Sequence, residues 1–136
     1  MVKVILGLKG TGKTKLMAEM VNEAVKTESG NIVCIEQNPT LTYDVDHSVR
    51  LINASSYDFK NFCFLKGFIS GLYANNYDLT HVFFDSLFKI IPRTGDDETV
   101  EFLDWLEKFS TENGVKFTIM ISQDPETAVE GIKKYC

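Results

Sequence analysis

A glycine-rich octapeptide near the start of the chain reads Gly7-Leu8-Lys9-Gly10-Thr11-Gly12-Lys13-Thr14, between the apolar run Val2–Leu6 and a helix-forming run. Its spacing matches the pattern G-x-x-x-x-G-K-[ST] without a deviation. Glycine accepts backbone angles that let successive N–H groups point toward one anion, and the N-terminal end of the following helix attracts the same anion. The preceding strand and following helix distinguish this loop from an ordinary glycine-rich turn, so the octapeptide predicts phosphate binding.

Two side chains of the octapeptide have specific roles in the predicted chemistry. Lys13 would reach the β- and γ-phosphates of a nucleotide, and the Thr14 hydroxyl would bind Mg²⁺. Lys9 is the weakest candidate, because ParA- and MinD-type ATPases carry a second lysine directly after the first glycine, where this chain has Leu8. A solvated loop lysine is the alternative there. The residues predicted to bind the cofactor are Gly7, Lys9, Gly10, Thr11, Gly12, Lys13, Thr14 and Lys15.

The composition favours a single globular domain over residues 1–136. Hydrophobic residues make up 44% and charged residues 24% of the chain, which is ordinary for a globular protein. The net charge of −5 argues against a surface for nucleic acid or acidic lipid. No apolar run approaches the ~20 residues that span a bilayer. The three cysteines lack the spacing of a metal site, which predicts reduced thiols. The first residues are predicted to form a strand and not a signal peptide, and together these features predict a cytoplasmic protein.

Apolar runs and helix-forming runs alternate along the chain. The buried strands predicted from apolar runs are Val2–Leu6, Ile32–Ile35, His81–Phe84 and Val115–Ile121. The helices predicted from helical spacing are Lys13–Glu28, Asp58–Ala74, Asp97–Glu112 and Pro125–Lys134. This alternation predicts a three-layer α/β domain, with a mainly parallel sheet and helices on both of its faces.

Between these elements the local signals are weaker. Thr42–Val45 and Ser48–Ile52 flank Asp46-His47, a pattern that predicts a hairpin. Ser55 or Ser56 could cap the second helix, and Asp124 the last one. Gly67 and Gly71 lower the helix propensity of the second helix, which suggests that it packs closely against a neighbour there.

Ligands of parallel α/β sheets bind beyond the carboxyl ends of the strands, so the residues that follow each strand are the candidates for function. The segments in question are Gly7 onward, Glu36-Gln37, Asp85-Ser86 and Ser122-Gln123-Asp124.

One of these strands carries a resemblance to a known family. The run Val82-Phe83-Phe84-Asp85-Ser86 resembles a Walker B strand, and its Asp-Ser ending resembles that of RecA- and KaiC-type ATPases. In that superfamily the strand after the phosphate-loop helix ends near a catalytic glutamate, and here Cys34-Ile35 leads to Glu36. A polar sensor, frequently Gln, often ends the fourth core strand, and here Gln123 follows Ile121. The whole chain is also similar to small bacterial P-loop proteins, some of them labelled ATPases.

The resemblance implies a P-loop NTPase fold with ATP and Mg²⁺ as cofactors. It implies that Thr14 and Asp85 hold Mg²⁺, that Glu36 orients the attacking water, and that Lys13 and Gln123 contribute to catalysis. It also implies a strand order in which Val115–Ile121 lies between the phosphate-loop strand and the Walker B strand, followed by the strand that ends at Glu36. Each role has a structural alternative: Asp85 as a turn cap, Glu36 as a polar strand end, and Gln123 as a loop side chain bonded to the backbone.

The chain departs from this family in several ways. RecA-type domains are longer, and Asp85 is followed by Ser86 instead of the glutamate of AAA⁺ and ABC ATPases. No Asn-Lys-x-Asp signature of GTPases occurs. Phosphoryl transfer usually needs arginines, and the chain has two, Arg50 and Arg93. Arg93 is a stronger candidate than Arg50 for sensing the phosphate. The alternative for Arg93 is a solvated side chain, as is usual for arginines in loops. His47 and His81 are assigned no chemistry.

Two classes of function remain open on the sequence. The first is a Mg²⁺-dependent ATPase with slow basal turnover, stimulated by self-assembly into a homo-oligomer or by an unidentified protein partner. The second is an ATP- or ADP-binding regulatory or assembly module with little turnover. A small-molecule kinase fits less well, because such enzymes usually carry a lid with several arginines.

Overall fold

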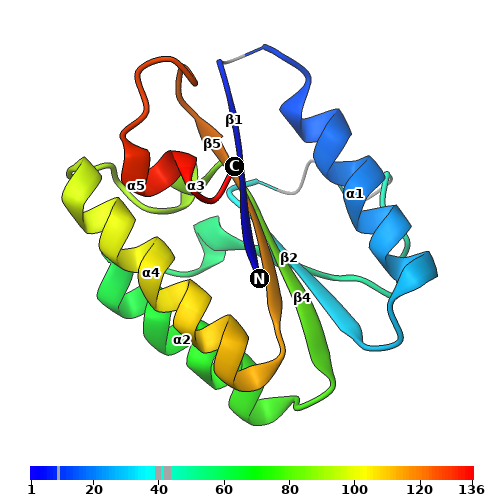
Figure 1. The fold of residues 1–136 in the computed structure, drawn as a ribbon. Coiled ribbons are helices and arrows are strands. Elements are labelled where there is room, and N and C mark those ends of the chain that lie inside the picture. Colours follow the sequence, from blue (N-terminus) through cyan, green and yellow to red (C-terminus); the bar gives the residue numbers. More distant parts are fainter. Residues whose placement is uncertain (9, 39–40, 42–43) are drawn as a thin grey trace.

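The strands of the chain form one parallel sheet in the order β1-β5-β4-β2-β3 (Figure 1). The structure is a computed structural model, and it describes residues 1–8, 10–38, 41 and 44–136. The strands are β1 (Val2–Gly7), β2 (Asn31–Glu36), β3 (Arg50–Asn53), β4 (Leu79–Asp85) and β5 (Lys116–Ser122). The helices are α1 (Lys13–Thr27), α2 (Phe62–Asn75), α3 (Leu87–Ile90), α4 (Asp96–Asn113) and α5 (Glu130–Lys133), with a 3₁₀ turn at Ala54–Ser56.

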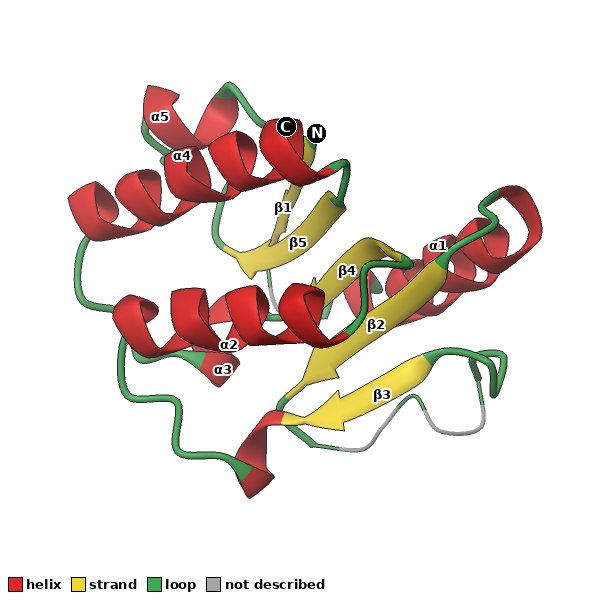
Figure 2. Ribbon diagram, turned by 90° about the horizontal axis from the view of Figure 1, so that it is seen from below, coloured by secondary structure: helices red, strands yellow, loops and turns green. Residues whose placement is uncertain are grey.

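The neighbours predicted for the core strands are confirmed. Strand β5 lies between β1 and β4, and β2 follows β4. Strand β3 adds a fifth strand beside β2 at the far edge of the sheet, as Figure 2 shows. Strand β1 forms the other edge, which is unusual for a P-loop domain. Its outer side is covered, because Val4 N donates to Tyr135 O at 2.8 Å and Val2 N donates to Glu107 Oε2 at 2.9 Å.

Both faces of the sheet are covered by helices, which gives the three predicted layers (Figure 1). Strand residues alternate between the faces, so Phe83 packs with the α1 side chains and Phe84 packs with those of α2 and α4. The α1 face is built from Met17, Val21, Ala24, Cys34, Phe83 and Met120, among others. The α2–α4 face includes Leu65, Ile69, Phe84, Phe102, Leu103 and Ile119. No helix in the described part of the chain is long and apolar enough to cross a membrane.

The hairpin predicted around Asp46-His47 is wrong. Strand β3 pairs with β2 in the parallel direction, with Ile52 opposite Ile35, instead of folding back on the preceding run. Asp46 ends that run in a turn, since its side-chain Oδ1 accepts from Ser48 N at 2.8 Å. Part of the other predicted strand, Thr42 and Tyr43, lies outside the described residues.

Two predicted helices begin later than expected. Helix α2 begins at Phe62 because Asn61 caps it, accepting from Phe64 N at 2.8 Å, while Ser55 and Ser56 belong to the 3₁₀ turn. Helix α5 begins at Glu130. The Asp124 side chain does not cap it, because its Oδ1 accepts from Glu126 N at 2.9 Å in a local turn.

The glycines of α2 do not mark close packing, so that prediction is wrong. A Cβ added at Gly67 or at Gly71 would meet nothing within 4 Å among the described residues. Gly67→Ala and Gly71→Ala should therefore each raise the free energy of unfolding by about 0.5–1 kcal/mol, because glycine costs conformational entropy inside a helix. Denaturant unfolding measures this, and Gly30→Ala is the opposite control, since its Cβ would lie 2.5 Å from Asp78 O. Destabilised Gly67→Ala and Gly71→Ala variants would contradict the open environment.

Candidate functional site

The loop between β1 and α1 has the backbone geometry that an anion site needs. Gly10 and Gly12 have φ angles of 85° and 80°, in the left-handed region that side chains disfavour. Gly12 is also the N-cap of α1, and its carbonyl accepts from Leu16 N at 3.1 Å, the first bond of the helix. The N–H groups of the first helical turn therefore lie directly after the loop, where they favour negative charge. Lys9 lies outside the described residues.

Gly7 and Leu8 hold the loop in a closed turn. Thr11 Oγ1 and Lys13 Nζ each donate to Leu8 O at 2.7 Å. A Cβ at Gly7 would lie 2.8 Å from Thr11 Oγ1 and 3.3 Å from Lys13 Cδ, so the first glycine is required by close approach. The predicted binding residues Gly7, Thr11 and Lys13 thus contact or nearly contact one another.

A cavity of about 260 Å³ lies over this loop. It joins the loop to the ends of β4 and β5 at the carboxyl edge of the sheet, where ligands of such sheets bind. Its volume is below the ~300–1,000 Å³ of pockets that enclose a drug-sized ligand, and it suits phosphate groups better than a whole nucleotide. The residues that line it are Gly10, Gly12, Lys13, Thr14, Lys15, Ser86, Lys89 and Ser122.

Asp85 ends β4 beside this cavity and is half-buried. Burial raises the pKa of its carboxyl, and the ammonium groups of Lys89 and Lys13 oppose that shift. Burial and the charge of Lys89 lower the pKa of Lys13, while Asp85 opposes that change. The three side chains therefore share one electrostatic environment, with one acid between two cations.

Glu36 lies next to Asp85 across the sheet. The two residues are register partners at the ends of β2 and β4. Glu36 is 1% exposed. Strand alternation puts it on the α1 face with Cys34, and burial, Glu36 and Asp85 all raise the pKa of the Cys34 thiol. The structure thus brings two of the predicted site carboxylates to the same end and face of adjacent strands.

Gln123, like Asp85 and Glu36, is not among the residues that line the cavity. Its backbone forms an isolated bridge with Gly7, and its side chain is 8% exposed. The cavity is lined by Ser122 and not by Gln123. Among the described residues, Gln123 Oε1 is buried and has no hydrogen-bond partner. Its sensor role stays a prediction.

The arginines and histidines lie outside this cavity. Arg93 donates from Nη2 to Asp96 Oδ1 at 3.2 Å and lies 5.1 Å from the centroid of the Phe88 ring. Arg50 begins β3, on the far side of β2 from this cavity. His81 is buried between Glu28 Oε2 and Thr118 Oγ1, both at 2.8 Å, and burial lowers its pKa. His81 thus has structural partners at the amino end of β4.

Sequence reasoning placed Ser86 and Ser122 in candidate segments without giving them a role, and it missed Lys89, which also lines the cavity. Ser86 has φ 60°, a left-handed angle that is costly for a side chain and turns the chain sharply after Asp85. Leu87 and Ile90 then anchor α3 in the core, with 0% and 5% exposure, so Lys89 between them points outward. The apolar spacing of Leu87 and Ile90 was the available signal for this turn.

The donor set fits a magnesium ion that is bound together with phosphates. Among the described residues, no group of three His, Cys, Asp or Glu side chains could hold a metal ion by itself. Mg²⁺ usually needs only one or two protein oxygens, because waters and phosphates complete its shell. A hydroxyl at Thr14 and a carboxylate at Asp85 supply such a set.

No protein-family model matches the chain, and a search of curated proteins finds no match.

Proposed function

We propose that the chain is a P-loop NTPase of the RecA-like division that binds ATP or ADP with Mg²⁺ and hydrolyses ATP slowly. The observation that carries this proposal is the cavity shared by the glycine loop, the start of α1 and the turn after Asp85. Backbone N–H groups, a helix N-terminus and the lysines Lys13, Lys15 and Lys89 converge there on a space of phosphate size.

Each residue of the site has a role that follows from its position. Lys13 offsets the charge on the β- and γ-phosphate oxygens, and the Thr14 hydroxyl is a direct ligand for Mg²⁺. Asp85 holds Mg²⁺ through a water, since Mg²⁺ retains several waters in such sites. The elevated pKa of Asp85 reflects burial, and a bound cation favours its ionised form.

Glu36 is the residue that we propose orients the attacking water. Its place beside Asp85, at the end of β2 and on the α1 face, puts its carboxylate at the same edge as the phosphate loop. A carboxylate there accepts a hydrogen bond from water, which aligns the water oxygen for attack on the terminal phosphate.

Lys89 supplies a further cation where the sequence offers no arginine. It lines the cavity from α3, together with Lys13 and Lys15 from the start of α1. We propose that its ammonium contacts the terminal phosphate of ATP. A cation added to the transferring group in trans by a partner is worth roughly 10³–10⁵ in rate. Among the described residues no arginine lines this cavity. Turnover by the isolated chain should therefore be slow, and self-assembly or a protein partner should stimulate it.

Removing Lys89 should change the preference between ATP and ADP. Lys89→Ala should weaken ATP binding by about tenfold, equivalent to about 1.4 kcal/mol, and leave ADP binding nearly unchanged, because the ammonium lies at the γ-phosphate. Lys89→Arg should retain the preference. Calorimetric titration with each nucleotide measures this, with Lys108→Ala on α4 as a control for loss of one surface charge. If the ratio of the ATP and ADP affinities is the same in Lys89→Ala and wild type, Lys89 does not contact the terminal phosphate.

The alternative is a nucleotide-binding regulator without turnover. The positions of Gln123 and Glu36 outside the cavity lining favour it, because groups that act at the terminal phosphate should line that space. Both functions require binding, so thermal unfolding with ATP and ADP, with and without Mg²⁺, tests what they share. A nucleotide at 100 times its dissociation constant should stabilise the fold by ~2.7 kcal/mol. Single-turnover hydrolysis then separates them: cleavage of bound ATP supports the ATPase, and stable bound ATP supports the regulator.

A further inference from the structure

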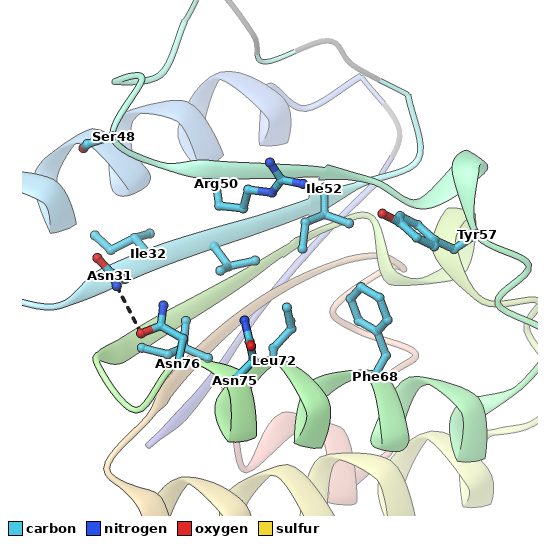
Figure 3. Close-up of a pocket in the computed structure, with 12 residues that line it drawn as sticks. Asn31, Ile32, Ser48, Arg50, Ile52, Tyr57, Phe68, Leu72, Asn75 and Asn76 are labelled. Carbon is cyan, nitrogen blue, oxygen red and sulfur yellow. Dashed lines mark hydrogen bonds between the residues drawn. The ribbon is translucent and has the colours of Figure 1, made fainter.

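A second and larger cavity lies between the β2–β3 edge of the sheet and helix α2 (Figure 3). Its volume is about 580 Å³, within the ~300–1,000 Å³ of small-molecule sites. It lies on the α2 face of the sheet, whereas Glu36 lies on the α1 face. None of the residues that line it lines the phosphate-loop cavity.

Arg50 gives this cavity its charge. In the register of β2 and β3, Arg50 lies opposite Val33 and Ile52 lies opposite Ile35, and both β2 residues belong to the core on the α2 face. A cation therefore occupies a position whose β2 neighbour belongs to the core, while the Arg50 side chain itself is exposed. Among the residues that the structure describes, no acid lies within ion-pair distance of Arg50, and it is the one charged side chain lining the cavity.

Amide groups fix the polar end of the cavity. Asn31 Nδ2 donates to Asn76 Oδ1 at 3.2 Å, and Asp78 N donates to the same oxygen at 3.1 Å. These two bonds determine the orientation of the Asn76 amide, so its N–H₂ group faces the space below β3, with that of Asn75 beside it (Figure 3). Arg50 lies across this space on β3.

The other end of the cavity is apolar and flat. Ile52, at this end, is 6% exposed and belongs to the core. The Tyr57 and Phe68 rings lie at this end, with their centroids 5.5 Å apart. Tyr57 remains 46% exposed, which is high for an aromatic ring beside a pocket. An aromatic body inserted here would gain edge or offset-stacked contacts with both rings in addition to the apolar area that it buries.

We propose that this cavity binds a small organic anion, an aromatic monocarboxylate, with its carboxylate on Arg50 and the asparagine amides and its ring against Tyr57 and Phe68. A planar guanidinium binds carboxylates in a fork geometry, and the amide N–H groups add neutral donors. The competing explanation is that Arg50 is a charge that keeps an edge strand from pairing with another sheet. That role needs no ligand.

The test compares two probes of one shape, 2-naphthoate and the neutral 2-naphthalenemethanol, titrated into the full chain and followed by ¹H–¹⁵N NMR. The wild type should bind 2-naphthoate about tenfold more tightly than the alcohol, with shifts at Arg50, Asn76 and Phe68. Arg50→Met should remove this preference and Arg50→Lys should keep part of it. Tyr57→Ala should weaken both probes. Arg93→Met, which removes an exposed loop arginine, is the matched control.

The outcomes decide between the two explanations of Arg50. Loss of the preference in Arg50→Met, with Arg93→Met unchanged, supports the anion site. Equal binding of both probes by the wild type overturns it, as does failure of 2-naphthoate to bind, and either result leaves Arg50 as an edge-strand charge. If Arg50→Met fails to fold, the Arg50→Lys and Tyr57→Ala titrations decide instead. The site is overturned if Arg50→Lys keeps the full preference for 2-naphthoate, or if Tyr57→Ala binds both probes as tightly as the wild type does.

Discussion

Lys13→Ala should lower the affinity for MgATP by well over tenfold, at about 1.4 kcal/mol per tenfold. The substitution removes the ammonium that we propose pairs with the β- and γ-phosphates, and leaves the backbone N–H groups of the loop in place. Burial and Lys89 already lower the pKa of Lys13, so in the free protein its charge is less stable than in water. A bound phosphate reverses this, because negative charge favours the protonated amine.

Calorimetric titration of wild type and variant measures the difference. The control is Lys26→Ala, which removes one exposed lysine from the last turn of the same helix and should leave affinity unchanged. Unfolding curves must coincide for the two variants, so that a change in affinity is not a change in folding. Equal nucleotide affinity in Lys13→Ala and wild type would show that the loop is not the nucleotide-binding site.

Glu36→Gln should preserve ATP binding and abolish turnover. The amide keeps the shape of the side chain and removes the negative charge that orients and polarises the attacking water. Loss of a positioned carboxylate of this kind costs roughly 10²–10⁴ in rate. Single-turnover hydrolysis measures the rate, and titration of the same preparation measures the affinity.

The matched control is Glu23→Gln, which neutralises an exposed acid on α1 and should hydrolyse ATP as fast as wild type. A Glu36→Gln variant that also hydrolyses ATP at the wild-type rate would show that the glutamate assignment is wrong. A wild type that binds ATP and never hydrolyses it would favour the regulator.

The sheet was predictable from the sequence because its strands are continuous apolar runs. Ile32–Ile35 and His81–Phe84 are apolar on both faces, as parallel strands between two helical layers must be, and both are strands in the structure. The order of the strands was predicted from the resemblance and not from periodicity, because the local sequence of a parallel strand does not indicate which strand it pairs with.

The elements that were misplaced depend on single side-chain bonds or on distant packing. Strand β3 has four residues, and its partner β2 lies on the other side of a long connection, so its apolar pattern fits a hairpin equally well. Helix α2 begins at Phe62 because Asn61 caps it, while the serines before it belong to the 3₁₀ turn. Caps compete within a few residues, and composition does not rank them.

The site was predictable where a motif fixes the residue and not where the fold supplies it. The loop glycines and Lys13 follow from the pattern, and the strand-end rule places Asp85 and Glu36 side by side, as the register shows. Lys89 enters the cavity because Ser86 takes a left-handed angle and two apolar residues anchor the turn. The spacing of Leu87 and Ile90 is a local signal for the turn, but the direction in which Lys89 points depends on how that turn packs against the core.

The most direct test of the central claim is an amide NMR titration of the wild type with MgADP. We expect saturable shifts at the Gly10, Gly12 and Thr14 N–H groups, because the diphosphate would accept hydrogen bonds from this loop and from the start of α1. The amides of α4 should stay unchanged. Saturation at the loop confirms the nucleotide site, and spectra that do not change with MgADP, or that change only away from residues 7–15, contradict it.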